Sequence, residues 1–234
     1  MASNDYISAI IVAGGTGRRF GNGQKKQFIQ LAGKPILFYS IDAFQRCELV
    51  SEIVLVLPAD NIEFYKNNLS GIGKFDKVRT ITEGGQTRQQ SVLNGLQKLS
   101  EITDIVLVHD AARPLVNIST INRVIEQTIV SDCAICAVSV SDTVKQASEN
   151  LIEKTVPRDN LWLAQTPQGI KYELIKRAYK NALDNNLSCT DEASLVEELG
   201  VKPAIVPGPK NNIKITTPDD LKLAEFYLME HADV

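Results

Sequence analysis

A cluster of glycine and basic residues near the amino terminus has the composition of a phosphate-binding loop. It is the segment Ala13-Gly14-Gly15-Thr16-Gly17-Arg18-Arg19, and Lys25 and Lys26 follow closely. Glycines let backbone N–H groups turn inward around phosphate oxygens, and the basic side chains supply positive charge. No Walker A ending is present, and Phe20 stands where a dinucleotide fingerprint has its third glycine. We expect the loop to hold a polyphosphate; the alternative is a plain glycine-rich turn.

A second glycine turn, Gly84-Gly85-Gln86, opens a segment with helical periodicity that contains Ser91. Flat backbone amides and a hydroxyl group in the first helical turn are suited to reading the edge of a base. The alternative is an ordinary helix start capped by Gln or Thr.

Asp110 follows an apolar run, within Val108-His109-Asp110-Ala111-Ala112-Arg113-Pro114. A carboxylate at the tip of a central strand is costly without a partner, and hard cations favour oxygen ligands. We therefore expect Asp110 to contact Mg²⁺, or another divalent cation, or a ribose. The alternative is a helix cap with Arg113 as its ion-pair partner. His109 could act as a general base, but a reaction in which the attacking group is an already ionised phosphate needs none. We therefore interpret His109 as a packing residue.

Short apolar runs rich in Ile and Val precede these loops and alternate with segments of helical periodicity. Such runs are typical of central parallel strands joined by crossover helices. They predict an α/β fold with a doubly wound, mostly parallel, Rossmann-like sheet, whose ligands bind beyond the carboxyl ends of the strands. The predicted strands are Tyr6–Ala13, Glu52–Leu57, Lys77–Thr82, Asp104–His109 and Ala134–Val140.

One stretch, residues 138–168, interrupts this alternation. Val144–Ala147 is predicted to pair with Leu151–Val156 around the polar turn Ser148-Glu149-Asn150. A two-stranded ribbon is marginal alone, so we expect this hairpin arm to pack on a partner subunit and to form a homodimer.

Length and charge bound the remaining possibilities. The 234 residues suit one domain, 1–234, and a net charge of −3 has the wrong sign for a nucleic-acid-binding protein. No apolar run approaches the ~20 residues of a membrane span, and the first residues lack the pattern of a signal peptide, so we expect a cytoplasmic protein with no membrane partner. Cys133 and Cys136 resemble a metal pair, but residues three apart on a strand point to opposite faces.

In their order along the chain, these motifs closely resemble those of the 2-C-methyl-D-erythritol 4-phosphate cytidylyltransferase family of the non-mevalonate isoprenoid pathway. The resemblance runs nearly end to end. It is carried by Ala13–Arg19, Lys26-Gln27, Gly84-Gly85 with Arg88 and Ser91, His109–Pro114, Asp142–Lys145, Pro157-Arg158 with Leu161-Trp162, Gln165–Gln168, Thr190–Ser194 and Asn212–Thr216.

The resemblance implies a nucleotide-diphospho-sugar transferase type of fold and transfer of CMP from CTP, the co-substrate, to a small sugar-alcohol phosphate. Arg19 and Lys26 would hold the CTP phosphates and stabilise charge on the α-phosphate. Asp110 would lie near the ribose and the metal. The cytosine and phosphates would be bound by the backbone at Val12 and by Ala13, Gly14, Gly15, Gly17, Gly85, Gln86 and Ser91.

On the acceptor side, the resemblance implies that Arg158 and Lys214 position methylerythritol phosphate as the nucleophile. Thr143, Thr166, Thr190 and Arg113 would assist them. The arm would reach across a dimer, so that Thr143 and Arg158 serve the neighbouring site.

Two other functions remain open from the sequence. A ribitol 5-phosphate cytidylyltransferase would share the fold and the CTP loop, and the small Ala112 is the feature that favours methylerythritol phosphate. A catalytically silent nucleotide-binding module would be expected to lack a loop cation or Asp110, yet these are present.

Overall fold

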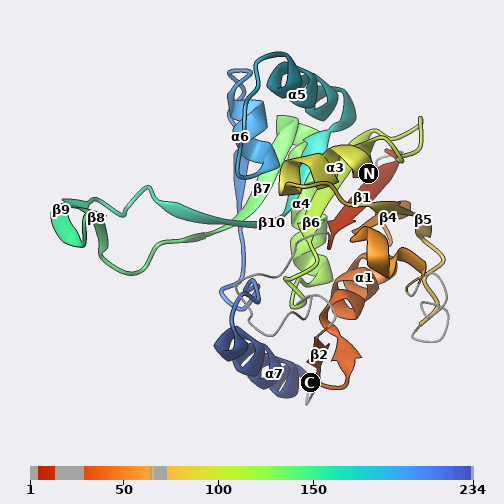
Figure 1. Ribbon diagram of the computed structural model, residues 1–234, viewed down its shortest axis with the longest axis horizontal. Coiled ribbons are helices and arrows are strands. Elements are labelled where there is room, and N and C mark those ends of the chain that lie inside the picture. Colours follow the sequence, from red (N-terminus) through yellow and green to blue (C-terminus); the bar gives the residue numbers. More distant parts are fainter. Residues whose placement is uncertain (1–4, 14–28, 64, 66–72, 233–234) are drawn as a thin grey trace.

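The computed structural model describes residues 5–13, 29–63, 65 and 73–232. Within them, seven strands form one sheet in the order β11-β7-β10-β6-β1-β4-β5 (Figure 1). Every neighbouring pair is parallel except those made by β10, which is antiparallel to both β6 and β7. The strands are β1 (Ile7–Val12), β4 (Glu52–Leu57), β5 (Val78–Glu83), β6 (Ile105–Asp110), β7 (Cys133–Ser139), β10 (Trp162–Lys171) and β11 (Ala204–Pro207).

The predicted fold class is confirmed. All five apolar runs form strands, each starting and ending within one residue of its predicted bounds. β4 and β6 are buried at every position, as expected of strands that are covered on both faces.

Helices cover both faces of the sheet (Figure 1). One face packs against α1 (Ile36–Arg46) and α4 (Ile118–Ser131), and the other packs against α3 (Arg88–Leu96), α5 (Tyr172–Asp184) and α6 (Glu192–Glu197). Cys136 packs in the apolar cluster on the face of α1 and α4, and Cys133 packs in the cluster on the face of α3, α5 and α6. Their side chains therefore lie on opposite faces of the sheet, as predicted.

The segment 138–168 contains both the hairpin and a strand of the central sheet. The hairpin consists of β8 (Val144–Ser148) and β9 (Leu151–Val156), but β10 begins at Trp162 and runs between β6 and β7. β10 was not predicted from the sequence, because Pro167 and several polar residues are unusual in a central strand. A register shift between Ala164 and Gln168 accommodates them. β11, only four residues long, was also not predicted.

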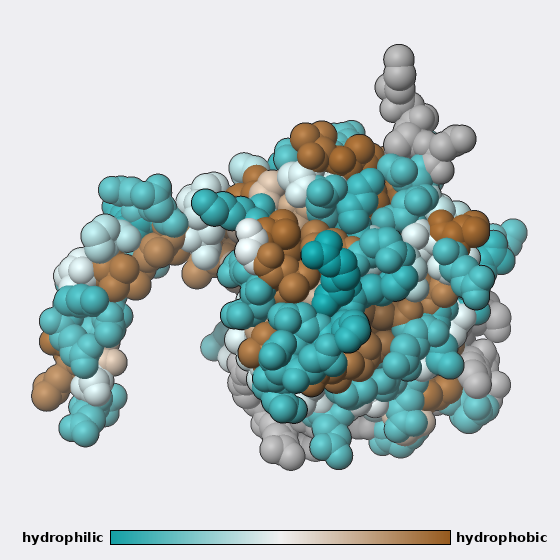
Figure 2. Space-filling view, turned by 90° about the horizontal axis from the view of Figure 1, so that it is seen from above, coloured by the Kyte–Doolittle hydropathy of each residue, from teal (hydrophilic) through white to brown (hydrophobic). Residues whose placement is uncertain are grey.

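The hairpin projects away from the body of the protein (Figures 1 and 2). Its turn residues Glu149 and Asn150 have φ values of 51° and 63°, and positive φ at both central residues is the geometry of a tight hairpin turn. Leu151 and Ile152 are 72% and 66% exposed. The arm therefore presents apolar surface to its surroundings.

The C-terminal helix, α7 (Pro218–Ala232), begins directly after Thr217. Thr217 Oγ1 accepts from Asp220 N at 3.3 Å, and Asp220 Oδ2 accepts from Thr217 N at 2.8 Å. Leu221, Ala224 and Leu228 pack near the short hairpin of β2 (Gln30–Leu31) and β3 (Lys34–Pro35). The remaining short element is η3 (Ala59–Asn61). No helix in the described part of the chain has the length and apolarity needed to cross a membrane.

The sheet topology brings several predicted site segments to one edge. β1, β4, β5, β6 and β7 run in the same direction, and the antiparallel β10 starts at the edge where they end. Ala13, Gly84 and Asp110 thus lie at this edge together with Thr166.

Candidate active site

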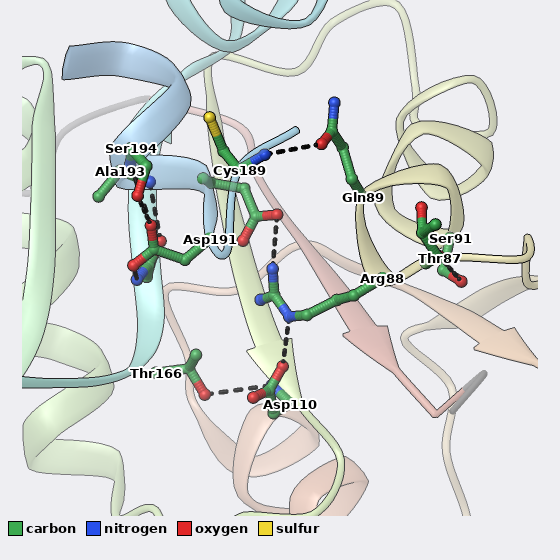
Figure 3. A network of polar contacts seen from close by, with 12 residues as sticks. Thr87, Arg88, Gln89, Ser91, Asp110, Thr166, Cys189, Asp191, Ala193 and Ser194 are labelled. Carbon is green, nitrogen blue, oxygen red and sulfur yellow. Dashed lines mark hydrogen bonds and ion pairs between the residues drawn. The ribbon is translucent and has the colours of Figure 1, made fainter. Parts of the chain in front are cut away.

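Asp110, the last residue of β6, lies at the centre of a buried polar network (Figure 3). Its Oδ1 accepts from Arg88 Nε at 2.9 Å, and its Oδ2 accepts from Lys214 Nζ at 2.5 Å. Arg88 also donates from Nη1 to Glu192 Oε1 at 2.8 Å. The side chains come from α3, β6, α6 and the segment after β11, so the fold joins four distant parts of the chain at this carboxylate.

The two cations decide the ionisation of Asp110. Burial alone raises its pKa, but the adjacent charges of Arg88 and Lys214 outweigh burial and hold the pKa well below the usual range of an aspartate. Burial also raises the pKa of Glu192, and Arg88 opposes that effect. Two cations and two carboxylates cancel, so this network adds no net positive charge for a triphosphate.

His109 and Thr166 support the backbone of Asp110. Thr166 Oγ1 accepts from Asp110 N at 3.1 Å and lies 2.9 Å from His109 Nδ1, while His109 Nε2 lies 3.2 Å from the carbonyl oxygen of Arg113. Burial lowers the pKa of His109 to about 3, so the ring is neutral. A carbonyl only accepts, so Nε2 carries the proton, and the Thr166 hydroxyl donates to Nδ1. His109 is a fully buried structural residue that also packs against Phe44, as expected from the sequence.

The turn at Gly84-Gly85-Gln86 is held by Ser91. Gly85 N donates to Ser91 Oγ at 3.0 Å, and Ser91 Oγ donates to the carbonyl oxygen of Thr87 at 2.9 Å. Only glycine fits at position 85, because an added Cβ would lie 2.0 Å from Gln90 Cγ. Thr87 is the N-cap of α3, so the helix-start alternative describes the local structure. Gln86 in this turn is exposed, whereas Ser91 is buried in the first turn of α3.

Arg113 is not the ion-pair partner of Asp110. Its guanidinium donates to the carbonyl oxygens of Asn212 at 2.8 Å and Ala164 at 3.2 Å, which ties β10 to the segment that carries Lys214. Its Nε has no hydrogen-bond partner in the described part of the chain.

The remaining acceptor-side residues lie further out. Thr190 is exposed and directly precedes Asp191, the N-cap of α6. Thr143 and Arg158 are exposed at the root of the arm, where Arg158 donates to the carbonyl oxygen of Ser141. Among the described residues, no hydrogen bond or ion pair joins these three to the network around Asp110.

The predicted phosphate loop begins beside this network. Ala13 N donates to the carbonyl oxygen of Val56 at 2.8 Å, and the carbonyl oxygen of Val12 accepts from Ala111 N at 3.0 Å. The loop therefore starts next to Asp110. Its predicted site residues lie outside the described residues: Gly14, Gly15, Gly17, Arg19 and Lys26.

Sequence reasoning assigned no site role to Arg88 or Glu192. A signal was present, because Arg88 is the first residue of α3 and a cation is unfavourable at a helix N-terminus. An arginine in that position therefore indicates carboxylate partners, although the sequence does not say which.

Comparison with known proteins agrees with this geometry. The family model for 2-C-methyl-D-erythritol 4-phosphate cytidylyltransferase matches residues 7–230. The chain belongs to this family. A relative of that name from Syntrophus aciditrophicus is 43% identical over 223 residues, which are 95% of each chain. One from Alkaliphilus oremlandii is 43% identical over 97% of each chain.

Solved structures of family members have the same fold. The 4-diphosphocytidyl-2C-methyl-D-erythritol synthase from Anaerococcus prevotii superposes with a TM-score of 0.85 at 30% identity, covering 97% of this chain and 100% of that one. The 2-C-methyl-D-erythritol 4-phosphate cytidylyltransferase from Francisella tularensis gives 0.81 at 38% identity, with coverages of 95% and 99%.

Proposed function

We propose that the protein transfers CMP from CTP to 2-C-methyl-D-erythritol 4-phosphate, giving 4-diphosphocytidyl-2-C-methyl-D-erythritol and pyrophosphate in non-mevalonate isoprenoid biosynthesis. The observation that supports this most is the meeting of Lys214 with Asp110 at the edge where the glycine-rich loop begins. It brings an acceptor-side cation to the nucleotide side of one site. The family membership and the names of the relatives support the choice of substrates.

In this reaction, an oxygen of the acceptor phosphate attacks the α-phosphorus of CTP, and the bond to the departing pyrophosphate breaks. Both reactants are anions, so the protein must screen their repulsion and fix the line of attack. Arg19 and Lys26 hold the CTP phosphates, whereas Lys214 and Arg158 hold the acceptor phosphate. No general base is required, and the buried, neutral His109 is not available as one.

Gly85, Gln86 and Ser91 form the cytosine side of the proposed site. The Gly85–Ser91 hydrogen bond keeps the backbone of this turn in one conformation. On the acceptor side, the Thr166 hydroxyl already donates its hydrogen bond to His109 Nδ1. It can therefore serve the acceptor only through its remaining oxygen lone pair. Arg113 shapes the site by holding the Lys214 segment.

A divalent cation fits this site only together with the nucleotide. No group of three or more His, Cys, Asp or Glu side chains able to hold a metal occurs in the described residues. Asp110 supplies one hard carboxylate, and Mg²⁺ commonly combines one or two carboxylates with substrate phosphates. Asp110 would thus hold the cation together with the phosphates of the nucleotide. When bound, the cation would neutralise charge on the phosphates.

We also infer a homodimer formed through the arm. The exposed Leu151 and Ile152 lie on a two-stranded ribbon with no layer covering it in the described chain. Thr143 and Arg158 at its root then serve the neighbouring site. Sedimentation of wild type should give a dimer, and a Leu151→Asp/Ile152→Asp variant should give a monomer. A wild-type monomer at micromolar concentration contradicts the proposal.

The proposed function is tested by pyrophosphate release with CTP and one acceptor at a time. Methylerythritol phosphate should support turnover, and ribitol 5-phosphate should not. Activity with ribitol phosphate alone would replace the proposed acceptor. Absence of release with either acceptor, in a protein that binds CTP, would favour a silent nucleotide-binding module.

A further inference from the structure

Arg88 occupies a position that is electrostatically unfavourable for a cation, so its side-chain contacts must compensate. It occupies the first position of α3, where the positive end of the helix dipole disfavours a cation. It nevertheless bridges two carboxylates from different elements, Asp110 of β6 and Glu192 of α6 (Figure 3). Its guanidinium is therefore fixed from both sides.

Glu192 anchors the far end of this bridge. It is 1% exposed, and its Oε1 accepts from Tyr179 Oη at 3.2 Å in addition to Arg88. The next residue of α3, Gln89, holds the segment that leads into α6: its Nε2 donates to the carbonyl oxygen of Leu187 at 3.2 Å, and its Oε1 accepts from Cys189 N at 3.2 Å. Arg88 thus approaches Asp110 from a helix end that is bonded both to Glu192 and to the segment leading into α6.

The two carboxylate oxygens of Asp110 therefore have partners that differ in exposure. Oδ1 is held by Arg88, whose side chain is 25% exposed and doubly paired, whereas Oδ2 is held by the more exposed Lys214. A ligand that reaches Asp110 can exchange with Lys214 at Oδ2 while Arg88 keeps the carboxylate plane fixed. Lysine does not replace arginine here, because an ammonium is a single point charge and a guanidinium is a planar fork.

We propose that Arg88, supported by Glu192, is a positioning residue that fixes the Asp110 carboxylate for CTP. The inference rests on the proposed function, which assigns Asp110 to the nucleotide. Arg88 acts through Asp110 and through the end of α3, directly after the turn that holds Gly85. Its loss should therefore weaken CTP binding much more than acceptor binding.

The test compares Arg88→Lys and Glu192→Gln with wild type. Arg123→Lys is the control for the same substitution away from the site. Exposed Arg123 also donates hydrogen bonds to two partners, but these are neutral: the carbonyl oxygen of Pro207 at 2.7 Å and Thr120 Oγ1 at 3.3 Å. CTP affinity is measured by calorimetry with and without Mg²⁺. Initial rates then give KM and kcat/KM for CTP and for methylerythritol phosphate, and circular dichroism shows whether each variant is folded.

Arg88→Lys should weaken CTP binding and lower kcat/KM for CTP by about 10- to 100-fold, the usual effect of removing a partner that orients a binding group. Glu192→Gln, which keeps the shape of Glu192, should act in the same direction by a smaller factor. KM for the acceptor should change less than about threefold, and Arg123→Lys should resemble wild type.

Folded Arg88→Lys and Glu192→Gln proteins that bind CTP within about twofold of wild type would overturn the inference. An equal rise in KM for both substrates would also overturn it, since that indicates a general structural role. If wild type binds CTP but releases no pyrophosphate, the proposed function fails, and the calorimetric comparison still decides the role of Arg88.

Discussion

Replacing Thr166 with valine removes one hydroxyl group from beneath the proposed site and keeps the shape of the side chain. Thr166 is 4% exposed, and its hydroxyl accepts from Asp110 N and donates to His109 Nδ1. In Thr166→Val both of these buried groups lose their partner.

The cost follows from the two orphaned groups. Leaving one buried donor or acceptor unsatisfied costs about 1–3 kcal/mol, so two of them predict a loss of about 2–6 kcal/mol of unfolding free energy. Thr120→Val is the matched control. Thr120 is fully buried, but within the described residues its hydroxyl accepts from exposed Arg123, whose guanidinium can turn to water. Its replacement should cost less than about 1 kcal/mol.

Urea unfolding of the two variants and wild type, followed by circular dichroism, measures both losses. The account predicts a difference of at least about 1 kcal/mol between the variants with unchanged dependence on urea. Equal stabilities of Thr166→Val and Thr120→Val would refute the assignment of the Thr166 hydroxyl of β10 as the shared hydrogen-bond partner of Asp110 N and His109 Nδ1 in β6.

Three further predictions concern catalysis, nucleotide binding and pH. Lys26→Ala should lower kcat far more than acceptor binding, because its charge serves the α-phosphate; wild-type kinetics in steady-state assays would contradict that role. Gly85→Ala should weaken CTP binding and cost about 1–3 kcal/mol of stability, since its Cβ collides with Gln90; calorimetry and urea unfolding measure these effects, and unchanged values would refute the collision. Burial lowers the pKa of His109 to about 3, so the unfolded chain binds an extra proton between about pH 6.5 and 3, and stability falls as pH falls through that range. Between pH 7 and 5, wild type should lose about 2 kcal/mol more than His109→Gln in urea unfolding, and parallel losses would show that His109 is not buried neutral.

The sequence predicted the strands whose neighbours on both faces are apolar. β4 and β6 are covered by helices on both faces, so their residues are buried at every position and most of them are hydrophobic. Such a continuous apolar run is readily identified in the sequence. β10 lacks that signature because its buried polar residues, including Gln165 and Gln168, bond to other loops instead of packing against helices. Such bonds depend on the tertiary structure, which periodicity does not report.

The sequence indicated which residues of the candidate site require a polar partner, but it did not identify that partner. Asp110 was singled out because a carboxylate at the tip of a central strand needs a partner. In the structure its carboxylate pairs with Arg88 and Lys214, and its backbone N donates to Thr166 Oγ1. The bond from Arg88 to Glu192 spans 104 residues, and no local pattern encodes that pairing. Proximity in sequence offered Arg113 as the partner of Asp110 in the alternative interpretation, but its guanidinium donates to backbone carbonyls instead.

In the proposed mechanism, cations of the first loop and Lys214 converge on two anionic reactants. A crystal structure with CTP and a methylerythritol phosphate analogue tests it most directly. The triphosphate should lie against Arg19 and Lys26, with the acceptor phosphate bound by Lys214 within the same site. A triphosphate bound elsewhere, or Arg19 and Lys26 directed away from the site that contains Lys214, would contradict it.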